Sequence, residues 1–69
     1  MVIYKVTAKK DGEEFYRDYF KLPQQAAIAA DHARHVHGAS AEWYSISEYE
    51  PEYAEGLESI KAKKKRNRL

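Results

Sequence analysis

The chain has 69 residues, with 12 Lys or Arg against 11 Asp or Glu, and contains no cysteine. A chain of this length forms one domain with a small core. Without cysteine it can form neither disulfides nor thiolate metal sites. No apolar run approaches the roughly 20 residues of a membrane span, and the alternating, lysine-containing start is unlike a signal peptide. We therefore expect a soluble, cytoplasmic protein that requires no cofactor.

Charge is distributed unevenly along the chain. Residues 1–60 carry six Lys or Arg and eleven Asp or Glu, whereas residues 61–69 carry six Lys or Arg and no acid. We expect residues 1–60 to form a single α+β domain and residues 61–69 to be a basic tail or helix end. A basic segment points to acidic partners, although blocks of like charge are most often only solvated.

The first part of the chain predicts a β-hairpin. Residues 2–9 alternate and are rich in β-branched and aromatic residues, which favours a strand, and residues 13–22 predict a second one. Asp11-Gly12 between them is the dipeptide that a type I′ turn prefers, because both central residues need positive φ. The predicted pairs are Lys10 with Glu13, Lys9 with Glu14, Ala8 with Phe15, Thr7 with Tyr16, and Lys5 with Asp18. Three of these pairs join opposite charges, which favours this register.

The remainder predicts a helix, a strand and a second helix. Pro23 suits the first position of a helix, and the Ala-rich segment that follows closes on Gly38, a favourable residue after a helix end. Residues 41–50 alternate as a third strand. Pro51 begins a second helix with acids first and bases last, as the helix dipole prefers, although Gly56 costs it about 1 kcal/mol relative to alanine. The order β-β-α-β-α predicts an α+β domain with a three-stranded antiparallel sheet.

The predicted register places aromatic side chains on both faces of this sheet. We expect the Ala-rich helix to cover one face and to leave an aromatic face opposite to it. That face would carry Tyr16, Phe20, Trp43 and Tyr49. Exposed patches of this kind usually mark contact surfaces, and Tyr and Trp are enriched at binding hot spots. The alternative is that the C-terminal helix covers this face through Tyr53, Leu57 and Ile60.

Three histidines lie close together near the end of the first predicted helix. His32 and His35 share a helix face and are the candidates for metal ligands. His37 lies about 140° around the helix from His32, zinc needs further ligands, and histidine is favourable near a helix C-terminus without any metal. We therefore expect no metal site. With neither a nucleophile elbow nor a Gly-rich phosphate loop, we also expect no enzymatic activity.

Two functions from different classes remain. The first is a non-catalytic protein-binding module, such as a phage or mobile-element accessory protein or inhibitor that acts on a host protein. It would use the aromatic face and an acidic surface formed by Glu48, Glu50, Glu52 and Glu55. A second copy of the chain, giving a homodimer, is another candidate partner for this face.

The alternative function is nucleic-acid binding. The basic C-terminal segment would contact phosphates and the aromatic residues of the sheet would stack on bases. The residues expected to carry this binding are Lys61, Lys63, Lys64, Lys65, Arg66 and Arg68. The net negative charge of residues 1–60 opposes it.

The segment YKVTAKKDGEEFYRDYF, followed by an Ala-rich helix, is similar to the small sheet-and-helix DNA-binding domains at the start of some phage-type integrases. Those domains place three strands before the helix, whereas here two are predicted before it and one after it. The resemblance rests on the hairpin turn and the aromatic strands and assigns no role to any residue.

Overall fold

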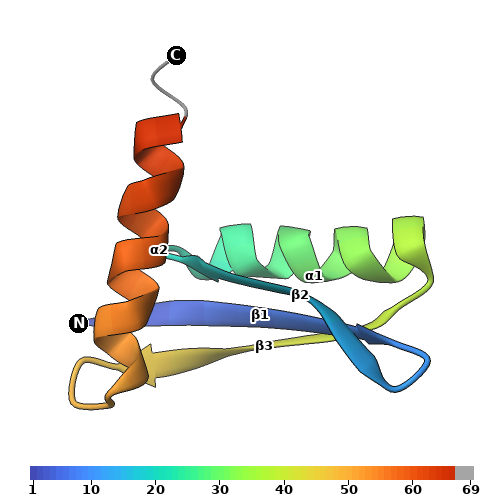
Figure 1. The fold of residues 1–69 in the computed structure, drawn as a ribbon, viewed down its shortest axis with the longest axis horizontal. Helices are drawn as coiled ribbons and strands as arrows, with labels where there is room; N and C mark the ends of the chain where they lie inside the picture. Colours follow the sequence, from blue (N-terminus) through green and yellow to red (C-terminus); the bar gives the residue numbers. More distant parts are fainter. Residues whose placement is uncertain (67–69) are drawn as a thin grey trace.

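The computed structural model describes residues 1–66, with side chains described for residues 1–63. Its elements follow in the order β1 (Val2–Lys10), β2 (Glu13–Phe20), α1 (Pro23–His37), β3 (Ser40–Ser47) and α2 (Glu52–Arg66). The strands form one antiparallel sheet in the order β2-β1-β3. The predicted α+β class and the order β-β-α-β-α are therefore confirmed. Helix α1 lies along the sheet and α2 crosses it near the start of β1, with its C-terminal end projecting beyond the strands (Figure 1).

Local sequence signals set the ends of these elements. The turn between β1 and β2 uses positive φ at both Asp11 (55°) and Gly12 (81°), as a type I′ turn requires. Pro23 starts α1, where its missing N–H has no consequence. Gly38 ends α1 in the left-handed conformation, and the Ala39 N–H donates to the Ala33 carbonyl at 3.2 Å.

The hairpin register departs from the prediction beyond the turn. The two pairs next to the turn are as predicted, but the pairing shifts between Ala8 and Lys9. Ala8 lies opposite Tyr16 instead of Phe15, so Phe15 is the extra residue of a β-bulge. The predicted register is therefore wrong from this point to the end of β2.

This one-residue offset exchanges the two faces of β2. Lys5 lies opposite Tyr19 rather than Asp18, and side chains alternate between faces along a strand. Tyr16 and Phe20 therefore lie on the α1 side of the sheet, where they pack beside Val6. The predicted aromatic face opposite α1 is not formed by these residues.

Helix α1 covers its side of the sheet with small side chains. Ala26, Ala30 and Ala33 are buried there, against Val6 and Ala8 of the central strand. Alanine allows the helix backbone to lie close to the sheet. The helix lies mainly against β1 and β3, so it leaves the β2 part of this face only partly covered.

Helix α2 covers the opposite face, as in the alternative left open by the sequence. Its core cluster consists of Ile3, Tyr19, Ile46 and Ile60, with Tyr53 and Leu57 packed against it. Gly56 makes this contact close. A Cβ at Gly56 would lie 2.8 Å from Cδ2 of Tyr19 and closer still to Cδ1 of Ile3. The helix propensity lost at Gly56 is therefore offset by packing.

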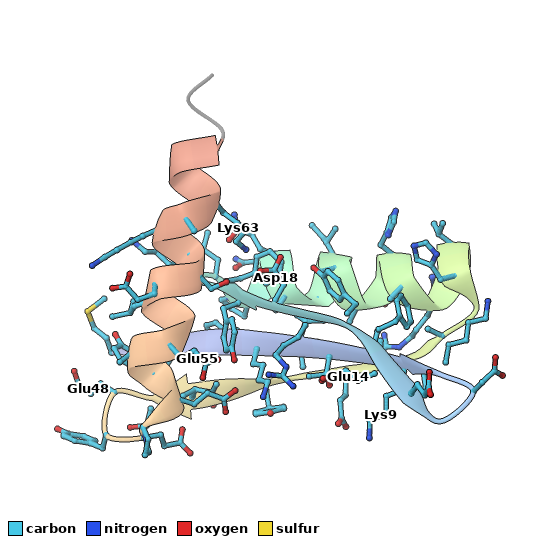
Figure 2. The ribbon with its side chains drawn as sticks, in the orientation of Figure 1. Lys9, Glu14, Asp18, Glu48, Glu55 and Lys63 are labelled. Carbon is cyan, nitrogen blue, oxygen red and sulfur yellow. The ribbon has the colours of Figure 1, made fainter. Side chains whose placement is uncertain are left out.

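Polar contacts fix α2 to the sheet at two levels, and Figure 2 labels Lys63 and Asp18 of the second level. Near its start, the Glu52 carboxylate lies 2.5 Å from the Lys5 ammonium and accepts a 2.7 Å hydrogen bond from the Tyr19 hydroxyl. Three turns later, the Lys63 ammonium lies 3.0 Å from the Asp18 carboxylate and donates to the Tyr19 carbonyl at 2.5 Å. Burial, together with the Glu52 contact, raises the pKa of Tyr19 to about 12.

We expect Gly56→Ala to lower the free energy of unfolding by about 1–3 kcal/mol, because the added methyl group overpacks the contact with Ile3 and Tyr19. Helix propensity alone predicts a gain of about 1 kcal/mol. Urea denaturation decides between the two. Ala54→Gly, at an exposed position of the same helix, is the control and should show the propensity effect only. A Gly56→Ala variant as stable as the wild type would contradict the packing role.

We expect Glu52 to make stability depend on acid pH. The hydrogen bond from Lys5, and then that from Tyr19, lowers the pKa of the Glu52 carboxyl below its ordinary value of 4.5. Its contribution is thus present above pH 4.5 and is lost as pH falls through the lowered value. Glu52→Gln should cost about 1 kcal/mol at pH 7 and less at pH 3 in urea denaturation. Equal losses at both pH values, or an equal pattern in exposed Glu58→Gln, would contradict this.

Candidate functional site

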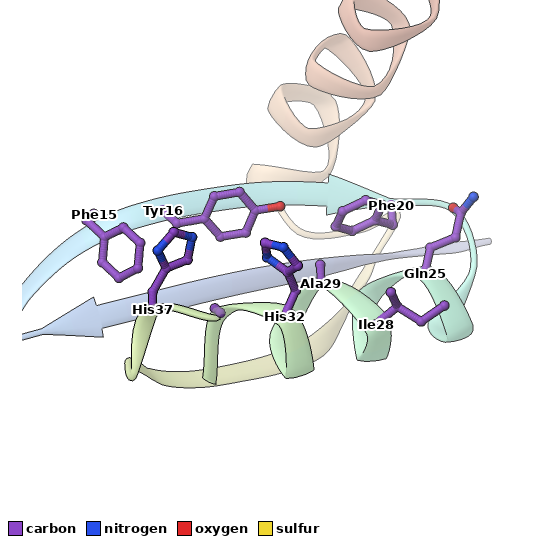
Figure 3. Close-up of a pocket in the computed structure, with 9 residues that line it drawn as sticks. Phe15, Tyr16, Phe20, Gln25, Ile28, Ala29, His32 and His37 are labelled. Atoms are coloured by element: carbon purple, nitrogen blue, oxygen red, sulfur yellow. The ribbon is translucent and has the colours of Figure 1, made fainter. Parts of the chain in front are cut away.

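An apolar groove of about 550 Å³ runs between β2 and α1 (Figure 3). Side chains from β2 form one wall and side chains from the outer side of α1 form the other. The main lining residues are Phe15, Tyr16, Phe20, Ile28, His32 and His37. Pockets that bind ligands or peptide side chains typically combine such an apolar lining with a few polar groups.

The groove follows from the bulge and from the small side chains of α1. The bulge turns Tyr16 and Phe20 toward α1, but α1 lies mainly over β1 and β3. The space beside β2 is therefore not filled. Phe15 and Ile28 lie on its two sides and are 49% and 69% exposed. Two large apolar side chains beside the groove are therefore in contact with solvent.

The polar groups of the groove are two imidazoles and a phenol. The rings of His32 and His37 meet edge to face with centroids 5.7 Å apart, and His37 meets Phe15 in the same way at 5.7 Å. The Tyr16 hydroxyl donates to the Asp18 carboxylate at 3.1 Å. Burial, and then the neighbouring Asp18 charge, raises the pKa of Tyr16 to about 12, so this hydroxyl stays protonated at neutral pH.

The structure does not bring His32 and His35 together as a ligand pair. Nδ1 of His35 lies 2.8 Å from the backbone carbonyl oxygen of Asp31, whereas His32 faces His37. In the part of the chain that the structure describes, no three His, Asp or Glu side chains gather as they would around a metal ion. In an ideal helix His37 would lie about 140° around the axis from His32. In the structure the two rings nevertheless meet, and both line the groove.

The four aromatic residues predicted as a protein-binding face do not form one surface. Tyr16 and Phe20 lie together in the groove. Trp43 lies near the other edge of the sheet and packs against Tyr4, with ring centroids 5.9 Å apart. Tyr49 follows β3 in a turn and is 89% exposed.

Three of the four predicted acidic residues contact separate groups of the fold, and the fourth is exposed. Glu48 lies 3.3 Å from the N-terminal ammonium group, the Glu50 carboxylate accepts the Ser47 N–H at 2.7 Å, and Glu52 contacts the sheet as described above. Glu55 is exposed (Figure 2). Three of the four therefore make contacts within the fold.

The predicted nucleic-acid residues begin inside α2, which continues to Arg66. Lys61 is exposed, but Lys63 is held within the fold. Besides its contacts with Asp18 and Tyr19, its ammonium lies 3.7 Å from the centre of the Phe20 ring, a cation–π contact. The remaining predicted positions fall outside the described side chains or outside the described residues: Lys64, Lys65, Arg66 and Arg68.

Sequence reasoning missed Phe15, Ile28 and His37 as parts of the site. Phe15 and Tyr16 are consecutive large aromatic residues in a strand, and such a pair is compatible with a bulge that lets both contribute to one surface. Ile28 lies outside the alanine stripe that α1 buries. Ile28, a large apolar residue outside the buried stripe of α1, was therefore the sequence signal that could have indicated this wall of the groove.

Comparison of the chain with protein-family models, curated proteins and solved structures finds no match. Among the residues that the structure describes, no helix has the length and apolar character needed to cross a membrane.

We expect Lys63→Met to lower the free energy of unfolding by about 1–2 kcal/mol, because it removes an ion pair, a hydrogen bond and a cation–π contact while keeping an apolar side chain of similar length. Lys61→Met, at an exposed position two residues away, is the matched control. Thermal or urea denaturation compares them. Equal effects of the two substitutions would show that Lys63 contributes only charge.

Proposed function

We propose that the protein is a non-catalytic protein-binding module whose groove between β2 and α1 accepts an apolar segment of a partner protein. The observation that carries this proposal is the pair of exposed apolar side chains, Phe15 and Ile28, on the two sides of a hollow of about 550 Å³. A small domain gains most from burying such side chains. Their exposure beside a groove supports the interpretation that this surface binds a partner.

The lining of the groove indicates the chemistry of the bound segment. Phe15, Phe20 and Ile28 suit an aliphatic or aromatic side chain, and burial of such a side chain contributes about 1.5–3 kcal/mol. His32 and His37 carry ring nitrogens that can exchange hydrogen bonds with the backbone of the segment. We propose a short segment with an apolar anchor residue as the occupant.

The role as an accessory protein or inhibitor, of phage or mobile-element origin and acting on a host protein, remains a proposal of the same kind. It rests on the roles that are common among small domains without catalytic motifs and not on a contact in this structure. The acidic residues contribute less to this role than the groove does, because three of the four have partners within the fold.

Nucleic-acid binding remains the second candidate because six Lys or Arg lie in residues 61–69. Its test must spare Lys63, whose loss would disturb α2. A chain truncated after Lys63 removes four of the six basic residues and keeps this contact.

We expect Ile28→Lys to weaken binding of groove-selected peptides at least about tenfold, because it places a charge in the apolar lining. Peptides are selected from a displayed library on the intact protein, and their Kd values are measured by calorimetry. Val36→Lys is the matched control: Val36 is similarly exposed, at 62% against 69%, and lies on α1 outside the groove lining.

Three results would count against groove binding. One is an equal loss of affinity in the two lysine variants, and another is failure of the library to yield binders. The third is capture from lysate that disappears with nuclease and with truncation after Lys63 but survives Ile28→Lys. The last result would favour nucleic acid, since phosphate contacts by the tail do not need the groove.

A further inference from the structure

The two edges of the sheet differ in how they are protected. On β2, the bulge at Phe15 interrupts the regular pairing. Side chains also form hydrogen bonds with the outward N–H and C=O groups of Tyr19. Its N–H donates to the Asp18 carboxylate at 2.8 Å, and its carbonyl accepts from Lys63 at 2.5 Å. Bulges, charges and covered backbone groups are the means by which proteins block pairing at a sheet edge.

The edge formed by β3 has no bulge, and side chains cover its outward backbone groups only near its two ends, at Ala41 and Ser47. It pairs with β1 without a break from Ser40 to Ser47, and its eight residues contain one charge, Glu42, and neither proline nor glycine. Trp43 and Tyr44 are 38% and 44% exposed along it. A long, regular edge with little charge is a template for another strand.

Three hydrogen bonds, at Ala41 and Ser47, show which backbone groups of β3 point away from β1. The Ala41 carbonyl accepts from Nη2 of Arg34 at 2.7 Å. At Ser47, the N–H donates to the Glu50 carboxylate at 2.7 Å and the carbonyl accepts the Glu50 N–H at 3.0 Å. Backbone direction alternates along an antiparallel strand, so residues 43 and 45 point outward as well. The outward N–H and C=O groups of these two residues make no hydrogen bond with any other group of residues 1–63.

We propose that this edge binds a second copy of the chain. The two β3 strands pair antiparallel about a two-fold axis perpendicular to the sheet, with Trp43 opposite Ser45 of the second copy and Tyr44 opposite its own equivalent. In this register the outward groups of Trp43 and Ser45 satisfy one another completely, because each facing pair exchanges two hydrogen bonds. Ala41 and Ser47 keep their contacts with Arg34 and Glu50.

The side chains are compatible with this pairing. Tyr44 meets its equivalent at the axis in a non-hydrogen-bonded pair, where side chains lie closest and aromatic pairs are favourable. Glu42 falls opposite Ile46 of the second copy, so no like charges face each other. On β2, pairing centred on Arg17 or on Asp18 would bring identical charges together. The charge pattern therefore favours self-pairing at β3 and disfavours it at β2.

The pairing joins two three-stranded sheets into one of six strands, with β2 at both outer edges. Both grooves stay open there, because the groove and β3 lie on opposite sides of β1. The dimer and the proposed function are therefore independent, and either can hold without the other.

Single cysteines test the register directly, because the chain has none of its own. Cα atoms of a non-hydrogen-bonded pair lie about 4.5 Å apart, within the range of a disulfide, about 4.4–6.8 Å. We expect Tyr44→Cys to form a covalent dimer on mild oxidation at least about tenfold faster than Trp43→Cys, whose equivalents lie diagonally, or Tyr49→Cys, which is exposed outside the strand. Faster cross-linking at residue 43 or 49 would overturn the register.

Sedimentation equilibrium of the full chain tests the dimer without cross-linking. We expect a mass of twice 8.0 kDa that shifts to the monomer in two variants. Ser45→Pro removes an outward N–H, which an edge strand tolerates, and Tyr44→Lys sets like charges at the axis. Tyr49→Lys carries the same charge change and should dimerise as the wild type does.

The circular dichroism spectrum of each variant shows whether the monomer remains folded, and two substitutions of different kinds guard against misfolding of one. Two results would overturn the proposal. One is a wild-type chain that stays monomeric at about 1 mM, the weak end of specific association. The other is a dimer whose Kd is unchanged, within about a factor of two, in both folded variants.

Discussion

The extra residue at Phe15 determines how both faces of the sheet are used. It sends Tyr19 toward α2 and turns Tyr16 and Phe20 toward α1. The regular register would have kept a charge pair between Lys5 and Asp18, worth about 0.2–1 kcal/mol. The bulged pairing gives up this pair and instead buries Tyr19 against α2, where its hydroxyl donates to Glu52. The two charges are not left alone, because each finds a partner on α2.

The two helices attach to the sheet in different ways, and the groove is a consequence of this difference. α1 buries alanines, which bring it close to β1 and β3 but cannot reach across to β2. α2 combines the close approach at Gly56 with charged contacts at Glu52 and Lys63. A helix with larger inward side chains in place of α1 would fill the space beside Tyr16 and Phe20. The groove is thus formed by the packing of α1 on the sheet, and its lining residues come from β2 and α1.

Local signals in the sequence predicted the order of the elements, and single residues or dipeptides fix several of their ends, although β3 ends at Ser47 and not at residue 50 as predicted. Asp11-Gly12, Pro23 and Gly38 do so through their own backbone preferences. The bulge could not be predicted in this way, since charge pairing across the hairpin favours the regular register and the observed pairing depends on how both helices pack on the sheet. Of the site, Tyr16 and Phe20 were identified as binding residues but on the wrong face. The wall from α1 depends on where that helix lies, which no local pattern determines.

The central strand belongs to both cores at once. Ile3 of β1 lies in the α2 cluster, whereas Val6 and Ala8 lie under α1. Both hydrophobic clusters therefore share β1. Detaching one helix would expose apolar side chains of the strand on which the other cluster also depends. The fold cannot be divided into halves that stay structured separately. Loss of either helix is therefore expected to lower hydrogen-exchange protection along β1, the strand that both clusters share.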